Sequence, residues 1–460
     1  MRPVLRREFP HRTPDMTVLR KFLLLGGIWL LGGTGLCGQS TPDYEQAPVS
    51  YSETTARDRL ARQLARIASG EIKFAGTDQE VLRTLLQVME VPEETQIFVF
   101  SKTSLQRGRI RPERPRVLYF SDSAYVGWVP GGLMEVTAID PELGPVFYSF
   151  DLGPTREKPP TIIREGDCLR CHGGTFVRDV PGVFVRSIFP DATGEPLLRH
   201  GTVVVDDETP FDQRWGGWYV TGYKGSEPHR GNSFASEKGD QLVFTPSGQR
   251  PDQLSGFFDT TDYLRPTSDM AALLVAEHQM AMQNSITRAG FVCRKMLTYQ
   301  RGLQTTFKEP VTEEPAYDSV KSVFASAVQD VVDHLLFRKA AMLPDGIVSN
   351  ADFKRSFPQG APRTRAGHSL KDLQLQDRIF VLRCSYLIYA ESFQALPEVL
   401  KVRIFERLRD ALRSTDPQER YAYLPAAERQ RIYEILFETQ PDARRYWSAR
   451  PGAVGPARTE

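Results

Sequence analysis

The spacing of apolar residues along the chain changes from a helical period to a strand period and back again. Between residues 57 and 90, apolar side chains return every three or four positions, which predicts two short helices with one buried face each. From residue 96 onward the period is two, and β-branched and aromatic residues are frequent between Gly, Pro, Asp and Ser. The first strands are predicted at residues 97–100, 117–120, 125–129 and 146–150.

The strand pattern resumes further along the chain and then gives way to a polar stretch. Further strands are predicted at residues 183–189, 202–205 and 218–220. Residues 222–262 are polar and rich in Gly, Ser, Asn and Pro, which predicts a long irregular excursion. Residues 39–56 are also polar and contain proline, and we expect a flexible leader there.

Beyond residue 263 the apolar spacing is helical again. Helices are predicted at residues 268–299, 317–341, 372–392, 397–414 and 426–438. Ser268 or Asp269 can cap the first of these helices, and Pro397 can open the fourth. The chain after residue 440 contains Pro and Gly and is expected to be loose.

Together with the length of 460 residues, these patterns predict an α+β protein with two larger domains. The first is a mixed, mostly antiparallel sheet domain that contains the cysteine motif described below, and the second is an all-helical C-terminal domain. The predicted segments are a signal peptide (1–38), a leader with short helices (39–95), the sheet domain (96–262), the helical domain (263–440) and a loose tail (441–460).

The first 38 residues have the features of a targeting signal for export. Basic residues outnumber acidic ones up to Lys21, and residues 22–31 form an apolar run of the length found in secretory signals. The whole chain has a formal net charge of +1, so loss of this basic segment leaves a nearly neutral, slightly acidic remainder. We therefore expect a periplasmic or otherwise exported protein.

Three alternatives stay open at this end of the chain. The apolar run is short for a bilayer-spanning helix and contains glycine pairs, but a retained membrane anchor is one alternative. Lipidation at Cys37 is another, although Leu36 is larger than the residue that such sites carry before the cysteine. Met16 is an alternative start that gives a more compact signal. Contact with a membrane is expected only if the signal is retained as an anchor.

The residues that carry chemistry are Cys168-Leu169-Arg170-Cys171-His172. This is the C-x-x-C-H spacing of c-type haem attachment, in which two thiols form thioethers with the two vinyl groups of one porphyrin. The adjacent His172 is then placed to be an axial ligand of the iron. The motif occurs once and predicts one covalently held haem c. A Cys168–Cys171 disulfide and half of a zinc site are the alternatives, although no second Cys or His pair with similar spacing is present.

With its export signal, the motif resembles the exported monohaem c-type cytochromes. The resemblance implies haem c with its iron, a periplasmic location and one-electron transfer to a redox partner protein of unknown identity. Small helical cytochromes carry the motif near the chain start on their first helix, whereas here it lies between predicted strands. This arrangement has a weaker, architectural likeness to exported haem-binding sensory domains with PAS-like sheets. That likeness implies the alternative of a haem-based sensor or gas-binding module with an open iron site.

Composition and the remaining motifs narrow the function classes. The chain is 40% hydrophobic and 25% charged, with neither a basic excess for nucleic acid nor an acidic tail. The signatures of serine hydrolases, P-loop proteins, zinc proteases and dinucleotide-binding proteins are absent. A haem peroxidase is the least favoured option. We expect an electron carrier or a haem-binding module rather than an enzyme.

The motif does not fix the sixth ligand of the iron. The mature chain offers several histidines, namely His200, His229, His278, His334 and His368, besides methionine thioethers. We choose His278 as the candidate distal ligand, because it shares a predicted helix face with Met282 four residues on. His229, in a loop that can fold over a cofactor, is the next choice, and a five-coordinate iron is the third alternative.

Two further features have a functional and a structural interpretation. Arg214 lies beside a patch of aromatic residues at 215–219 and can meet a haem propionate, or the patch can be a strand end packed into the core. Cys293 and Cys384 lie on separate predicted helices, where they can form a disulfide in an oxidising compartment or stay as buried thiols.

Overall fold

A computed structural model describes residues 41–448, except 154–157, 240, 246–248 and 417–418. The predicted signal peptide at 1–38 and the final residues 449–460 of the predicted tail lie outside the described residues. Among the described residues, no helix combines the length and the apolarity that crossing a bilayer requires. The fold class expected from the sequence is confirmed, with a β-sheet region followed by a helical region.

Seven strands form one sheet in the order β6-β5-β4-β3-β2-β1-β9, and every neighbouring pair is antiparallel. The strands are β1 (Ile97–Val99), β2 (Arg116–Ser121), β3 (Ala124–Trp128), β4 (Met134–Asp140), β5 (Gly144–Asp151), β6 (Thr161–Arg164) and β9 (Trp218–Tyr219). The strands predicted in this part of the chain are confirmed. The sheet also contains β4 and β6, which the sequence analysis does not predict.

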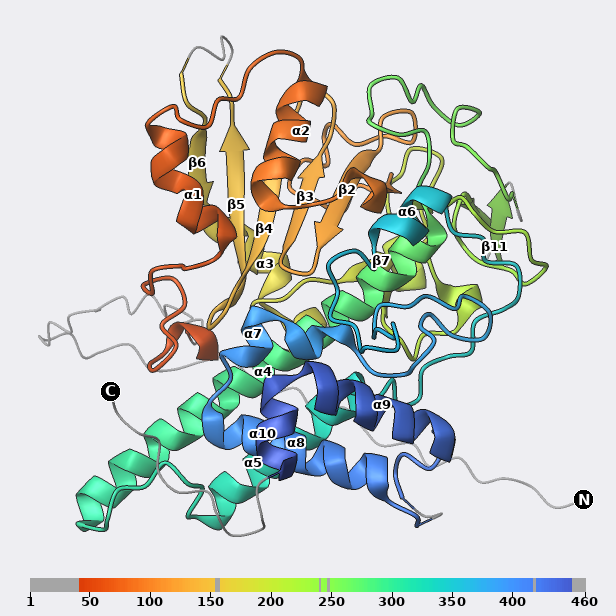
Figure 1. Cartoon of the computed structure of the whole chain (residues 1–460). Helices are drawn as coiled ribbons and strands as arrows, with labels where there is room; N and C mark the ends of the chain where they lie inside the picture. The colour runs from red at the N-terminus through yellow and green to blue at the C-terminus, as the bar shows by residue number, and fades with distance from the viewer. Residues whose placement is uncertain (1–40, 154–157, 240, 246–248, 417–418, 449–460) are drawn as a thin grey trace, which may run out of the picture. The chain divides into compact units, whose positions relative to one another are not determined.

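Helices α1 (Arg59–Ala68) and α2 (Asp78–Met89) cover one face of this sheet (Figure 1). Asp58 caps α1 by accepting from the backbone N–H of Ala61, and Thr77 caps α2 in a reciprocal capping box with Glu80. The apolar residues on this face of the sheet join those of both helices in one buried cluster. The two predicted short helices are therefore confirmed.

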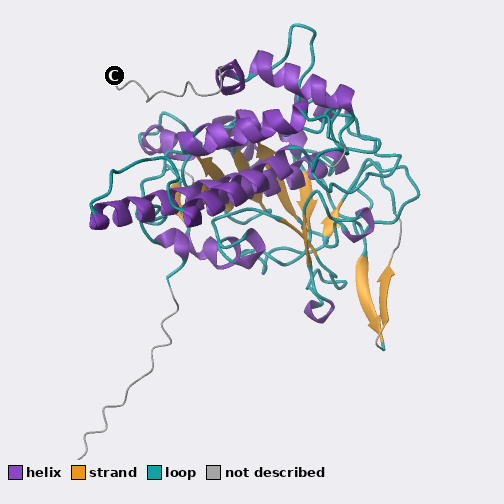
Figure 2. Ribbon diagram, turned by 90° about the horizontal axis from the view of Figure 1, so that it is seen from below, coloured by secondary structure: helices purple, strands orange, loops and turns teal. Residues whose placement is uncertain are grey.

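Helix α4 (Met270–Phe307) packs against the opposite face of the sheet. The hydroxyl of Tyr125 on β3 donates to Gln283 Oε1 at 2.7 Å and accepts from Gln279 Nε2 at 2.8 Å. Asp269 caps the helix by accepting from the N–H of Ala271. The sheet is thus enclosed between two helical layers, and Figure 2 shows helices lying across its strands. Side chains on both faces of β3 are therefore buried.

The remaining helices follow α4 in the chain. They are α5 (Asp318–Leu335), α6 (Ala351–Ser356), α7 (Glu391–Gln394), α8 (Glu398–Arg413), α9 (Ala426–Thr439) and α10 (Pro441–Ser448). Four of the five predicted helices are confirmed as α4, α5, α8 and α9, with shifted ends.

The predicted helix at 372–392 is wrong. The segment consists of turns and one 3-10 helix at Tyr386–Tyr389, followed only by the start of α7. Leu375 has a left-handed φ of +63°, and Leu373 bridges to Phe380 in an antiparallel sense. A helix cannot pass through such a residue. The apolar side chains reach the core from turns, so their helical spacing in the sequence does not report a helix.

Two segments predicted to be loose are packed. Residues 441–448 of the predicted tail form α10, and Trp447 Nε1 donates to the carbonyl of Phe405 at 2.9 Å. In the predicted flexible leader, Tyr51 is buried and its hydroxyl donates to the carbonyl of Pro145 at 2.7 Å. Aromatic side chains anchor both segments, because burying them outweighs the local Pro and polar content.

Two small ribbons lie outside the main sheet. β7 (Val185–Ser187) pairs with β8 (Val203–Val205), as expected from the strand pattern. β10 (Phe234–Lys238) pairs with β11 (Gln241–Thr245) inside the stretch predicted to be irregular, so that prediction is wrong for this hairpin (Figure 1). The domain boundaries predicted from the sequence stay predictions.

Candidate haem attachment site

The cysteine motif lies on a short helical turn between β6 and β7. A 3-10 turn (Gly166–Cys168) leads into α3 (Leu169–His172), and Glu165 caps it by accepting from the N–H of Asp167. Cys168 has helical backbone angles, φ −59° and ψ −33°. Residues three apart on a helix are surface neighbours, so this backbone places the two cysteines of the motif on one side of the turn.

His172 is held by its Nδ1 atom. Nδ1–H donates to the carbonyl of Gly182 at 2.9 Å, and the ring packs between Phe147 and Phe184 with centroid distances of 5.0 and 5.1 Å. Burial lowers the pKa of His172, so the ring is neutral near pH 7. Metal-binding histidines characteristically donate their second ring nitrogen to a carbonyl in this way. The Nε2 atom is thereby left with its lone pair for an iron.

Helix α4 fixes the loop that holds His172. The side chain of Asn284 accepts from the N–H of Val183 at 2.9 Å and donates to the carbonyl of Val183 at 2.7 Å. The neighbouring Gly182 donates its N–H to the carbonyl of His172 at 2.8 Å. A Cβ at Gly182 would lie 2.7 Å from Asn284 Oδ1, so only glycine fits there. Neither residue is predicted from the sequence, because neither forms a pattern with the motif.

The two thiols of the motif differ in exposure. Cys168 is half-buried and Cys171 is exposed, and both are free thiols in the structure. Burial, with the charges of Glu135 and Glu165, raises the pKa of Cys168 to about 12. Among the residues that the structure describes, no group of three or more His, Cys, Asp and Glu side chains is arranged to hold a metal ion.

Exposed apolar side chains border the motif. Phe176 is 43% exposed and contacts Phe184 at 5.7 Å between ring centroids, while Ile163 on β6 is 54% exposed. The guanidinium of Arg186 lies 5.2 Å from the ring of Phe176. Apolar surface beside two thiols and a neutral imidazole is the environment that a porphyrin covers. The residues around the motif therefore fit haem.

The structure places His278 in a different environment from His172. Nδ1 of His278 lies 2.8 Å from Asp207 Oδ2, Nε2 lies 2.8 Å from Ser385 Oγ, and the ring stacks on Phe337 at 4.1 Å. Both ring nitrogens are therefore engaged, and none of these partners contacts His172. The sequence places His278 and Met282 on one helix face, and in the structure that face is buried in the core.

The other candidate histidines also have contacts away from the motif. His229 packs against the aromatic rings of Phe211 and Trp215, and burial lowers its pKa to about 4. His200 Nε2 lies 2.8 Å from a Glu237 carboxylate oxygen. His334 contacts a backbone carbonyl of its own helix, and His368 is exposed. The described residues therefore give no assignment of a sixth ligand.

The basic residue of the aromatic patch belongs to the core. Arg214 Nη1 donates to Glu277 Oε2 at 2.6 Å, and Trp215 Nε1 donates to Glu277 Oε1 at 2.6 Å. All three side chains are buried. The patch is thus a packed strand end, and Arg214 is not left for a propionate.

Cys293 and Cys384 are buried free thiols whose pKa values are raised by burial.

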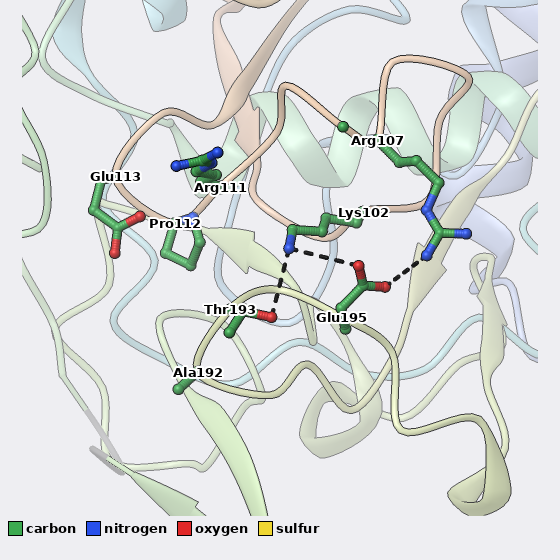
Figure 3. Close-up of a pocket in the computed structure, with 9 residues that line it drawn as sticks. Lys102, Arg107, Arg111, Pro112, Glu113, Ala192, Thr193 and Glu195 are labelled. Carbon is green, nitrogen blue, oxygen red and sulfur yellow. Dashed lines mark hydrogen bonds and ion pairs between the residues drawn. The ribbon is translucent and has the colours of Figure 1, made fainter.

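A separate cavity of about 420 Å³ lies between the loops at 102–113 and 192–195 (Figure 3). Lys102 and Arg107 line it and both pair with Glu195, at 3.5 and 2.8 Å. None of the motif residues lines this cavity. Because a carboxylate already compensates two of its cations, we assign it no ligand.

Comparison of this chain with protein families, with curated proteins and with solved structures gives no match. The chemistry of the site therefore follows from its own side chains. Cys168 and Cys171 lie on one helical turn, and His172 beside them has one ring nitrogen engaged and one free for a metal. Such a site can form two thioethers to one porphyrin and give its iron one nitrogen ligand.

Proposed function

We propose that the protein is an exported c-type cytochrome that carries one covalent haem and transfers single electrons. The observation that carries the proposal is the hydrogen bond from His172 Nδ1 to Gly182, which leaves Nε2 of a neutral ring for the iron. Cys168 and Cys171 would hold the porphyrin through thioethers. When bound, haem supplies one-electron exchange between Fe(III) and Fe(II).

The residues around the motif have definite tasks in this function. Phe147 and Phe184 restrict rotation of the His172 ring. The two hydrogen bonds of Asn284 to Val183 fix the adjoining carbonyl of Gly182, which orients the ring. Cys171 is exposed, so a group attached to it is reachable from the protein surface, as exchange with a redox partner protein requires. The export signal expected from the sequence agrees with this function, because haem c is attached outside the bacterial cytoplasm.

The second candidate function is a haem-based sensor or gas-binding module with an open iron site. The observation that favours it is that His278, our candidate distal ligand, has both ring nitrogens engaged elsewhere. An iron that lacks a second protein ligand binds small molecules such as carbon monoxide. The two candidate functions therefore differ in whether the sixth coordination position of the iron is filled by a protein side chain or open to small molecules.

A spectroscopic experiment tests the proposal. The full chain is produced in a bacterial host with haem-maturation machinery, and we expect a haem c pyridine haemochrome spectrum that survives denaturation, with one haem per chain. Absence of that band overturns the proposal. Carbon monoxide is then added to the reduced protein. An unchanged low-spin spectrum supports electron transfer, whereas ready binding favours the sensor or gas-binding module.

We expect His278→Asn to leave the haem spectrum unchanged and to lower the free energy of unfolding by about 1–3 kcal/mol. Asp207 and Ser385 would each lose a buried hydrogen-bond partner, while the motif would keep all its contacts. Absorption spectra of the oxidised and reduced variant and urea denaturation measure the two effects. Conversion of the iron to high spin in the variant would instead support His278 as the distal ligand.

A further inference from the structure

An ion pair crosses the central strands of the sheet beside the motif. Arg116 on β2 pairs with Glu135 on β4, and Gly127 of β3 lies between them. A Cβ at Gly127 would lie 2.5 Å from Arg116 Nη2, so the guanidinium lies over this glycine and a larger side chain there would displace it. The side chains of Arg116 and Glu135 are only 20% and 22% exposed. The pair is therefore shielded from most of the solvent.

The pair lies on the side of the sheet that faces the motif. Glu135 is the direct neighbour of Ser149 on β5, and Phe147 points to the same face two residues earlier. Phe147 is the residue whose ring contacts His172 at 5.0 Å. Diagonal neighbours on one sheet face are within reach of long side chains. The register thus places Glu135 close to His172.

The charges of the pair reach the motif at Cys168. The pKa of this thiol is raised by burial first and by Glu135 next, and Arg116 lowers it. A group bonded to Cys168 therefore experiences both charges.

The pair is only partly buried, so its contribution to stability is small. Removing two charges from water costs free energy, which their mutual attraction recovers only in part. Charges near a protein surface still act on groups a few ångströms away, because the effective dielectric constant there is well below that of bulk water.

We infer that the two charges of the Arg116–Glu135 ion pair act on the reduction potential of the haem held by Cys168, Cys171 and His172, and that their pairing keeps the two effects in balance. This inference rests on the proposed function. A nearby positive charge stabilises Fe(II) relative to Fe(III) and raises the potential, and a negative charge lowers it. In the intact pair the two effects oppose each other. Neutralising one member therefore exposes the effect of the other.

Potentiometric titration of the full-length holoprotein tests the inference. We expect Arg116→Gln to lower the midpoint potential and Glu135→Gln to raise it, while the double variant stays close to the wild type. For partly screened charges, the expected change is about three- to tenfold in the ratio of reduced to oxidised protein at a fixed ambient potential. Tenfold corresponds to about 59 mV for a one-electron couple.

Two controls separate charge from structural disturbance. Arg116→Lys keeps the charge and is expected to keep the potential near that of the wild type. Arg383 and Glu428 form a comparable pair, 22% and 8% exposed, between the loop before Tyr386 and helix α9. We expect the double variant Arg383→Gln with Glu428→Gln to leave the potential unchanged, because this pair does not contact the motif.

The possible outcomes distinguish the inference from the proposed function. If the wild type carries no covalent haem, both are wrong. If it carries haem and the two single variants keep its potential, or both shift it in the same direction, only the inference is overturned. If Arg116→Gln yields no holoprotein, Glu135→Gln decides alone: a raised potential supports the inference and an unchanged one overturns it.

Discussion

Replacing Cys168 and Cys171 together with serine is expected to abolish covalent haem attachment. A serine hydroxyl does not add to a porphyrin vinyl group, so neither thioether can form. Each single variant is expected to retain one thioether and to show a shifted haemochrome band, because one vinyl group then stays unsaturated. The measurements are haem staining after denaturing electrophoresis and the pyridine haemochrome spectrum of the purified protein.

The control for this prediction uses the two cysteines outside the motif. Cys293 and Cys384 are buried among apolar residues, where a thiol behaves as a small apolar side chain. Replacing either with alanine is expected to leave haem attachment intact. Covalent haem in the double serine variant would contradict the assignment of the motif, and loss of haem in the Cys293 or Cys384 variants would indicate that folding decides attachment.

The fold class is readable from the sequence because the periods of two and of three to four residues are separated along the chain. The sequence does not predict strands β4 and β6, and the reasons are local. β4 alternates buried Met134, Val136 and Ala138 with polar residues, but methionine and alanine carry little strand signal. β6 has only four residues at the sheet edge. Its assignment depends on pairing with β5, which no local pattern contains.

The errors in the helical region come from tertiary packing. Residues 372–392 carry apolar side chains at helical spacing. The backbone of Leu375 is left-handed and the surrounding residues form turns, so these side chains are buried in the core without a helix. In α10, Tyr446 and Trp447 bury their rings against α8, and this contact outweighs the nearby prolines and glycines. Sequence periodicity reports which side chains are buried, but it does not report which backbone carries them.

The candidate site, like the fold, can be predicted from the sequence only in part. Cys168, Cys171 and His172 are found from the sequence because thioether attachment requires a fixed local spacing. The sequence does not predict that Gly182, Asn284 and the Arg116–Glu135 pair lie near the motif. Only the sheet register and helix α4 bring them there. His278 shows why the prediction of a ligand from sequence is weak. A histidine on an apolar helix face meets the sequence criterion for a ligand equally well when it is a hydrogen-bonded core residue.

The core around His278 contains the interaction whose loss we expect to be most costly for stability. Glu277 is fully buried and accepts from Arg214 at 2.6 Å and from Trp215 at 2.6 Å. We expect Glu277→Gln to lower the free energy of unfolding by about 3–5 kcal/mol. Glutamine has nearly the same shape, so the loss reports the buried guanidinium of Arg214 left without its carboxylate. Urea denaturation followed by circular dichroism measures it.

Two comparisons show whether this loss comes from the unpaired charge. The double variant Arg214→Met with Glu277→Leu removes both charges, and apolar residues of similar volume often replace a buried ion pair at little cost. It is therefore expected to be more stable than Glu277→Gln alone. Glu313→Gln breaks an exposed pair with Arg301 and is expected to cost at most about 1 kcal/mol. An equal loss in Glu277→Gln and Glu313→Gln would mean that Arg214 finds water or another acceptor, so that the pair contributes packing rather than charge compensation.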